Sequence, residues 1–248
     1  MTYRIVDGEA RSEAVHHALD EVLLDRLDRG EIDPTLRVWD RERPAVPLGR
    51  FQAYADEVAT DYVESRDVDV VRRITGGGAM YVEPGDVITV SLYLPRSAVP
   101  DDVATSYEVL NEWMVEGLRD VGLDAAHEPL NDISHPDGKL GGAAQLRKED
   151  AVLHHATLSY DLDVEAMLSA LRIGEEKVSD KAVASAEQRV AVMRDHVDAS
   201  REAVVEALLD AFRSAYGGEP ASLAPETVAA AADRAAETFA TEAWTKRL

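Results

Sequence analysis

The sequence predicts an α+β fold in which a mixed, mostly antiparallel central sheet is flanked by helices. Short apolar segments of strand length occur between longer stretches of helical periodicity, without the regular strand–helix–strand alternation of a parallel sheet. In addition, Asp137-Gly138 lies between two extended segments, and Asp-Gly in that position is typical of a β-hairpin. No internal repeat or low-complexity linker divides the chain, so we expect a single domain over residues 1–248.

The N-terminal half begins with an amphipathic helix over residues 12–29, for which Gly30 is a typical stop. Apolar residues recur in it at i, i+3, i+4 and i+7, namely Val15, Ala18, Leu19, Val22 and Leu23. The segments expected next, in chain order, are a strand at 36–39, a turn with a short edge segment at 43–47, a short helix around 55–65, and strands at 68–74 and 87–94.

The C-terminal half combines the hairpin with four helices. Asp101 and Asp102 begin a helix that Gly122 ends. The hairpin strands are expected at 130–134 and 139–146, followed by a strand at 151–162. The remaining helices are expected at 163–171, 199–216 and 225–239, and we expect the helical part 199–248 to pack on the same domain.

The charge balance argues against several classes of function. The 48 acidic and 26 basic residues give a net charge of −22, which repels phosphates, so we expect no nucleic-acid partner. An acidic surface of this kind suits concentrated salt, as in halophile proteins, because salt screens the repulsion between like charges. There is no run of about 18 apolar residues and no secretory signal, so we expect no membrane partner and a cytoplasmic location.

The sequence contains no cysteine, which excludes disulfides, thiolate metal sites and cysteine nucleophiles. Against this acidic background, two groups of basic residues stand out beside glycine-rich segments. Arg72 and Arg73 form one group; Lys139, Arg147 and Lys148 form the other.

The three consecutive glycines at 76–78 follow the arginine pair. Because glycine has no Cβ and adopts positive φ readily, this loop can turn several N–H groups toward one point, as anion-binding backbone nests do. In this interpretation Arg72 and Arg73 lie at the mouth of the loop. The alternative is a plain glycine-rich connection between two strands, and the spacing does not match a P-loop.

Lys139 follows the Asp-Gly turn and precedes a run of small residues at 141–144. A ligand could approach the backbone of such a strand closely. Lysine in this position could bind a phosphate or carboxylate as a point charge. The alternative is a hairpin lysine that faces water.

Five motifs, in this order, resemble the lipoate–protein ligase A family, within the larger fold of biotin/lipoate ligases and octanoyltransferases. They are GRFQ at 49–52, VRRITGGGAMY at 71–81, NDI at 131–133, GKLGGAAQ at 138–145 and LHHATL at 153–158. The resemblance extends from the N-terminal helix to the region of Trp244, and it implies a biotin/lipoate ligase-like catalytic domain.

The resemblance implies an ATP-dependent ligase. Lipoate and ATP, which brings Mg²⁺, would give lipoyl-AMP and pyrophosphate, and the lipoyl group would then pass to a lysine of a carrier domain. It implies Lys139 as the catalytic residue, in contact with the lipoyl carboxyl and the α-phosphate. It also implies a set of lipoate- and ATP-binding residues, which are Arg73, Gly76, Gly77, Gly78, Ala79, Met80, Tyr81, Asp132, Gly142, Ala144 and His155.

The partners that the resemblance implies are the lipoyl carrier domains of 2-oxoacid dehydrogenase complexes and the glycine cleavage carrier protein. Full ligases of the family carry a small C-terminal accessory domain, whereas this chain resembles an archaeal type without it. We therefore expect either a separate accessory-domain protein or activity limited to transfer from preformed lipoyl-AMP.

Three positions depart from the family pattern. Val82 replaces a common histidine, and Gly141 and Ala143 replace small polar residues. Cysteine-dependent octanoyltransferases of this fold form a thioester, which a chain without cysteine cannot do. Two alternatives stay open: a cysteine-independent transferase that moves octanoyl or lipoyl groups between carriers, and a non-catalytic carrier-binding paralogue.

We expect no metal-binding residues beyond those that meet MgATP. The adjacent histidines 154 and 155 should point to opposite faces of a strand and so could not share an ion, and His155 should face the ligand. Asp132 could hold the magnesium, orient Lys139, or be an acid at a strand end.

Overall fold

The computed structural model describes residues 2–8, 10–172 and 190–248. Its central sheet has eight strands in the order β10-β1-β2-β5-β9-β8-β7-β6. β1 pairs in parallel with β10 and β2, and the other neighbours are antiparallel, which confirms the predicted mixed sheet. The strands are β1 (Arg4–Asp7), β2 (Thr35–Trp39), β5 (Val87–Pro95), β6 (Ala126–Glu128), β7 (Asp132–His135), β8 (Gly138–Arg147), β9 (Ala151–Ser159) and β10 (Glu219–Pro220).

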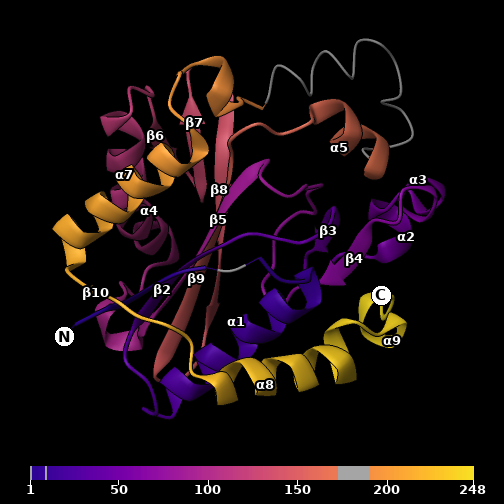
Figure 1. Ribbon diagram of the computed structural model, residues 1–248, viewed down its shortest axis with the longest axis horizontal. Coiled ribbons are helices and arrows are strands. Elements are labelled where there is room, and N and C mark those ends of the chain that lie inside the picture. Colours follow the sequence, from indigo (N-terminus) through magenta and orange to yellow (C-terminus); the bar gives the residue numbers. More distant parts are fainter. Residues whose placement is uncertain (1, 9, 173–189) are drawn as a thin grey trace.

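Helices cover both faces of this sheet (Figure 1). α4 (Val103–Asp120) and α7 (Arg201–Tyr216) pack together on one face, while α1 (Glu13–Asp28) packs on the other with α8 (Pro225–Arg234) beside it. One turn of π-helix, η4 (Ala235–Phe239), continues α8. The shorter helices are α2 (Tyr54–Glu57), α3 (Thr60–Ser65), η1 (Arg96–Ala98), α5 (Val164–Ala170), η3 (Met193–Asp195) and α9 (Glu242–Thr245).

The two faces of the central strands differ in polarity. In β5 the even residues from Ile88 to Leu94 belong to the large apolar core under α4 and α7. The odd residues Thr89 and Ser91 point to the opposite face, because successive side chains of a strand alternate. The polar side of the sheet therefore lies under α1 and the segments beside it.

A second, two-stranded sheet lies apart from the central one. β3 (Ala45–Leu48) and β4 (Asp69–Arg72) pair in parallel. The strand predicted at 68–74 thus ends earlier than expected, and the chain turns away before the glycine loop. The helix predicted around 55–65 is two short helices, α2 and α3, because Val58 has extended backbone and Ala59 is also non-helical.

The long helices match their predicted ranges, and side-chain caps explain the agreement for α4 and α7. Asp102 accepts a hydrogen bond from the N–H of Thr105, and Ser200 accepts one from Ala203, so α4 and α7 begin where the capping residues stand. None of the helices in the described ranges combines the length and apolar character that a membrane span requires.

Candidate functional site

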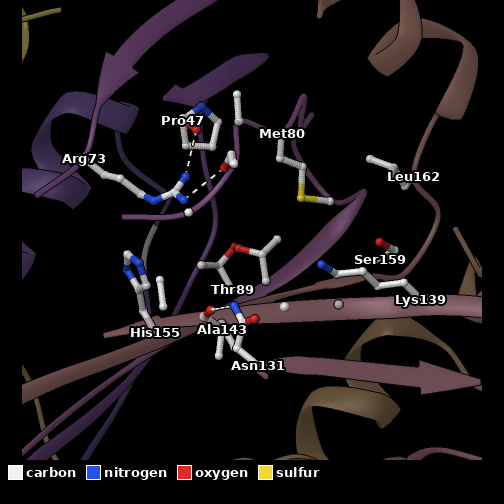
Figure 2. Close-up of a pocket in the computed structure, with 18 of the residues that line it drawn as sticks. Pro47, Arg73, Met80, Thr89, Asn131, Lys139, Ala143, His155, Ser159 and Leu162 are labelled. Atoms are coloured by element: carbon white, nitrogen blue, oxygen red, sulfur yellow. Dashed lines mark hydrogen bonds between the residues drawn. The ribbon is translucent and has the colours of Figure 1, made fainter. Parts of the chain in front are cut away.

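A cavity of about 290 Å³ lies between the polar face of the central sheet, the glycine loop and α5. Figure 2 shows Arg73 and Pro47 on one side of it, Lys139 on the other, and Thr89 and His155 from the sheet. Its apolar lining comes mainly from side chains outside the central sheet. These include Pro47, Ala79, Met80, Leu162, Met167 and Val190.

Strand register explains why polar side chains meet at this cavity. Thr89 of β5 lies opposite Thr157 of β9, which in turn lies opposite Gly142 of β8, and Gly142 lies opposite Asp132 of β7. Residues in one such row share a face of the sheet. Gly142 has no side chain, so this row leaves an opening that a ligand or a neighbouring side chain can occupy.

Lys139 fills part of that opening because of a β-bulge. The register shifts between Ile133 and Ser134, where Leu140 is the extra residue on β8, and this shift puts Lys139 on the same face as Gly142. The Lys139 side chain folds across Gly142, and its Nζ lies 2.7 Å from Asp132 Oδ1. Leu140 itself is fully buried on the other face.

Arg73 stabilises the glycine loop by hydrogen bonds to the loop's own carbonyl oxygens. Its guanidinium donates hydrogen bonds to the carbonyl oxygens of Pro47, Gly76 and Gly78 at 2.7–3.0 Å. Burial lowers the pKa of Arg73 to about 10, so the group stays protonated at neutral pH. Arg73 lines the cavity, as the family resemblance implies, and its donors bind carbonyl oxygens of the loop and of Pro47.

The loop carbonyls face Arg73, which fixes where the following N–H groups point. Across a trans peptide the N–H is antiparallel to the preceding C=O, so the N–H groups of Gly77 and Ala79 point away from the guanidinium. Gly77 has φ of 98°, a conformation that favours glycine. The loop also crosses Gly49 so closely that a Cβ there would lie 2.0 Å from the Gly77 oxygen.

A buried hydrogen-bond chain connects the loop to α1. Thr75 Oγ1 lies 2.8 Å from His155 Nε2, and His155 Nδ1 lies 3.0 Å from Asp20 Oδ2. Asp20 also accepts hydrogen bonds from Arg37 and Tyr93. Burial raises the pKa of Asp20, but the His155 hydrogen bond and the Arg37 charge outweigh it and hold the pKa well below its usual value.

The same desolvation acts on His155, since burial lowers its pKa despite the nearby Asp20 carboxylate. A neutral His155 that donates from Nδ1 to Asp20 has its Nε2 lone pair free to accept from Thr75, so the three groups form one continuous chain. These hydrogen bonds hold Thr75 and His155 in place on the side of the cavity opposite Lys139.

A second buried ion pair lies in the cavity wall. Arg41 Nε is 3.1 Å from Glu13 Oε2, and Glu13 Oε1 is 3.1 Å from His17 Nε2. The sequence analysis did not identify these residues or Asp20. The available signal was a polar stripe at 13, 16, 17 and 20 within the N-terminal helix, on a face that the structure buries as completely as the apolar one.

Comparison with known proteins gives the family. Residues 12–213 match the family described as the lipoyl protein ligase A/B catalytic domain. This chain belongs to that family. It is 31% identical over 251 residues to an octanoyltransferase LipM of Kyrpidia tusciae, covering 91% of this chain and 92% of that protein. It is 33% identical over 205 residues to lipoate-protein ligase A subunit 1 of Thermoplasma acidophilum, covering 79% of this chain and 76% of that protein.

Solved structures show the same fold over the whole length of this lipoyl ligase family chain. A bi-partite lipoate protein ligase of Thermoplasma acidophilum superposes with a TM-score of 0.88 at 29% identity, covering 100% of this chain and 98% of the other. A lipoate-protein ligase A bound with ATP gives 0.86 at 26% identity and 99% coverage of both chains. A putative lipoate protein ligase of T. acidophilum with bound lipoic acid gives 0.83 at 25% identity and full coverage of both.

Most of the ligand-binding residues expected from the family resemblance lie in the cavity wall. These are Arg73, Gly77, Gly78, Ala79, Met80, Lys139, Gly142, Ala144 and His155. Three others are not among the lining residues. Gly76 offers its carbonyl to Arg73, Tyr81 is buried and donates to Glu83, and Asp132 contacts Lys139. Their roles toward a ligand stay predictions.

The two basic groups do not form clusters. Lys139 and Arg147 stand at opposite ends of β8, about 26 Å apart at roughly 3.3 Å per residue. Arg147 binds Ser106, and Lys148 pairs with Asp25. Arg72 is fully buried and binds carbonyls of the C-terminal segment, among them that of Thr245, so it ties this segment to β4 rather than facing a ligand.

Packing explains two of the three departures from the family pattern, and the third, Ala143, lines the cavity. Val82 is fully buried in the core beside the small sheet, away from the cavity lining. At Gly141 a Cβ would lie 2.5 Å from the Thr157 carbonyl oxygen, so a serine would not fit in this register. His154 and His155 do point to opposite faces: His154 lies beside Tyr107 under α4, and His155 faces the cavity.

Proposed function

We propose that this chain is the catalytic subunit of an ATP-dependent lipoate–protein ligase. It activates lipoate as lipoyl-AMP and transfers the lipoyl group to a lysine of a carrier domain. One observation carries the proposal: the Lys139 ammonium is held by Asp132 over a side-chain-free strand position, at a cavity lined on its other side by buried Arg73 and His155.

In the first step, an oxygen of the lipoate carboxylate attacks the α-phosphorus of ATP. The bond from that phosphorus to the bridging oxygen breaks, and pyrophosphate leaves with the electron pair. Negative charge grows on the phosphoryl oxygens, so positioned cations and N–H donors accelerate the reaction. The Lys139 ammonium supplies the positive charge. The N–H groups of Gly77 and Ala79, which point away from Arg73, supply hydrogen-bond donors for the phosphoryl oxygens.

In the second step, the neutral amine of the carrier lysine attacks the acyl carbon of lipoyl-AMP. AMP leaves with the electron pair, the amine loses a proton to water, and an amide forms. Neither step needs a nucleophile from this protein, which agrees with a sequence that contains no cysteine. A cysteine thioester route is closed to this sequence.

Related structures support the identity of the substrates. One holds ATP and another holds lipoic acid, both at 25% identity or more over nearly the whole chain. Mg²⁺ enters as part of MgATP, and Asp132 is the nearest carboxylate to Lys139 that could meet it. The related archaeal lipoylation system comprises a bi-partite ligase and its E2 lipoyl domain, which supports a separate accessory protein and a lipoyl carrier domain as partners.

A cysteine-independent acyltransferase is the second candidate. It is favoured by the 31% identity to an octanoyltransferase over nine-tenths of both chains. Such an enzyme would take the acyl group from a carrier thioester without ATP. The third candidate is a non-catalytic carrier-binding protein. It is weakened because packing explains why Val82 and Gly141 differ from the family pattern.

The test mixes the purified chain with lipoate, MgATP and an apo lipoyl domain, with and without an accessory subunit, and measures pyrophosphate release and the mass of the carrier. We expect carrier lipoylation that depends on ATP. Lys139→Ala should reduce it about a hundredfold to a thousandfold, since it removes the positioned charge of the adenylation step. Lys148→Ala, which loses only a pair with Asp25 at the other end of β8, is the matched control and should retain activity.

Acylation from octanoyl-acyl carrier protein, with none from free lipoate and ATP under any of these conditions, would establish the transferase instead. Carrier binding without modification from either donor would establish the non-catalytic alternative.

A further inference from the structure

Three potential metal ligands converge at the tip of the β7–β8 hairpin, outside the cavity. His135 ends β7, Asp137 lies in the turn, and His196 directly follows η3. One ligand atom of each lies within 4.8 Å of those of the other two. His196 is too distant in the sequence from the hairpin for its proximity to be predicted from spacing.

The distances fit coordination better than hydrogen bonding. Asp137 Oδ2 is 3.5 Å from His135 Nδ1 and 3.7 Å from His196 Nδ1. A direct nitrogen–oxygen hydrogen bond would be about 2.7–3.2 Å long. In a tetrahedral zinc site with bonds of about 2.0–2.1 Å, neighbouring ligand atoms are roughly 3.4 Å apart. Both contacts are therefore close to the spacing that one shared ion produces.

The orientation of the imidazoles also suits an ion. The two rings are tilted by 31° with centroids 4.0 Å apart, and each turns Nδ1 toward the same carboxylate oxygen. His135 Nδ1 accepts a hydrogen bond of 3.2 Å from the backbone N–H of Asp137, so its lone pair points toward the turn, and a bound ion would replace that N–H as its partner. A lone pair on a neutral imidazole nitrogen is what a metal ion requires.

We propose that His135, Asp137 and His196 form a binding site for a first-row divalent metal ion such as Zn²⁺. Two imidazoles and one carboxylate leave a fourth position for water, and both histidines are only partly exposed while Asp137 is open to solvent. Imidazole ligands favour Zn²⁺ over the harder Mg²⁺, which separates this site from the magnesium that accompanies ATP.

The ion would join two chain segments that already meet beside Lys139. Ala191 donates its N–H to the Lys139 carbonyl oxygen at 2.9 Å, and His196 lies five residues beyond Ala191. A bound ion would pin the hairpin tip to the segment after residue 190, at a point two residues from Lys139. It would thus restrain the strand that carries Lys139 without touching the cavity.

The test uses untagged full-length protein, stripped of metal, in buffer with excess Mg²⁺ to occupy exposed carboxylates. Titration with Zn²⁺ should show one saturable site per chain and raise the melting temperature by roughly 5–10 °C at a hundredfold excess over Kd. Co²⁺ should give the intense visible absorption of a low-symmetry four-coordinate site. Hydrogen exchange in the hairpin should slow when the ion is bound.

His135→Ala, His196→Ala and Asp137→Asn should each weaken Zn²⁺ binding at least about tenfold. His127→Gln is the matched control, since His127 contacts Asn111 away from this cluster, and it should bind as the parent protein does. The melting temperatures of the metal-free variants show whether each is folded. Equal Zn²⁺ affinity in the parent and in His196→Ala, or the absence of a saturable site, would overturn the proposal. All readouts are binding measurements, so they do not depend on the proposed ligase activity.

Discussion

At the scale of single residues, Asp20 has the largest predicted effect on stability. It is fully buried and accepts hydrogen bonds from Arg37, Tyr93 and His155. Asp20→Asn keeps the shape but removes the charge that Arg37 pairs with, and breaking a buried pair costs about 3–5 kcal/mol. We expect the melting temperature to fall by roughly 6–20 °C. Thermal unfolding monitored by circular dichroism measures this.

The control for Asp20→Asn is Glu31→Gln, which removes the exposed pair with Arg29 and should leave the melting temperature unchanged. A drop of equal size in both variants would mean that the buried pair has no special role. Sequence reasoning placed Asp20 in the N-terminal helix but could not identify its partners, because they come from β2, β5 and β9.

Buried histidines predict the pH dependence of stability: two carry large shifts, and burial shifts the pKa of His155 in the same direction. Burial lowers the pKa of His16 and of His154 to about 3 in the folded chain. The unfolded chain protonates them near pH 6.5, so stability is complete above that pH and is lost as the pH falls toward 3. Asp20, whose pKa is also depressed on folding, adds a further loss only below about pH 4.

Urea unfolding at a series of pH values between 7.5 and 4 checks this, and we expect a steady decline that begins near pH 6.5. His154→Gln removes one of the two groups but keeps a polar side chain beside Gln145, and it should make the decline shallower. A flat profile between pH 7 and pH 5 in the parent protein would contradict the assignment.

At the scale of elements, the β7–β8 hairpin shows where prediction from sequence stops. Asp137-Gly138 predicted the turn correctly, and residues 139–146 do form a strand. The bulge at Leu140 could not be predicted, because register depends on both neighbouring strands and not on local residue preference. Without that bulge, Lys139 would point to the apolar face.

Replacing the two adjacent glycines of β8 by alanine, one at a time, should have opposite effects: one variant should lose stability and the other activity. At Gly141 the new Cβ would meet the backbone of Thr157 and Leu158, so Gly141→Ala should destabilise the fold by about 1–3 kcal/mol. At Gly142 it would meet the Lys139 ammonium at 3.0 Å and otherwise little backbone. Gly142→Ala should therefore displace Lys139 and reduce adenylation while the melting temperature changes little.

Parallel measurements of melting temperature and of pyrophosphate release separate these two effects, and each variant is the control for the other. The pair of outcomes would be wrong if Gly142→Ala lost stability but kept full activity, since Lys139 would then not lie across that position during catalysis.

At the scale of the whole molecule, composition and periodicity predicted the fold class, but not the way the cavity is enclosed. The strands β1, β6 and β10 were missed because four residues or fewer carry too little alternation to be recognised. The glycine loop joins β4, in the small sheet, to β5, in the central one, so the cavity lies between two sheets. Local sequence does not show which sheet a strand joins.

Surface charge also acts at the scale of the whole molecule. Exposed carboxylates lie on α4 and α7. Their field reaches Tyr216, whose pKa is raised to about 12 by burial first and then by the charges of Tyr3, Glu112 and Glu116. With a net charge of −22, the folded chain repels itself, and raising the salt from 0.1 to 1 M shortens the Debye length from about 10 to about 3 Å. We therefore expect the melting temperature to rise with KCl over this range.

The matched control lowers the charge without touching the core. Glu112→Gln, Glu116→Gln, Asp120→Asn and Glu206→Gln together remove four negative charges from the exposed sides of α4 and α7. This variant should be more stable than the parent at low salt and should gain less from added KCl, because less repulsion remains to be screened. If both proteins gain equally, the salt effect comes from hydration and not from charge, and the acidic surface is then no adaptation to salt.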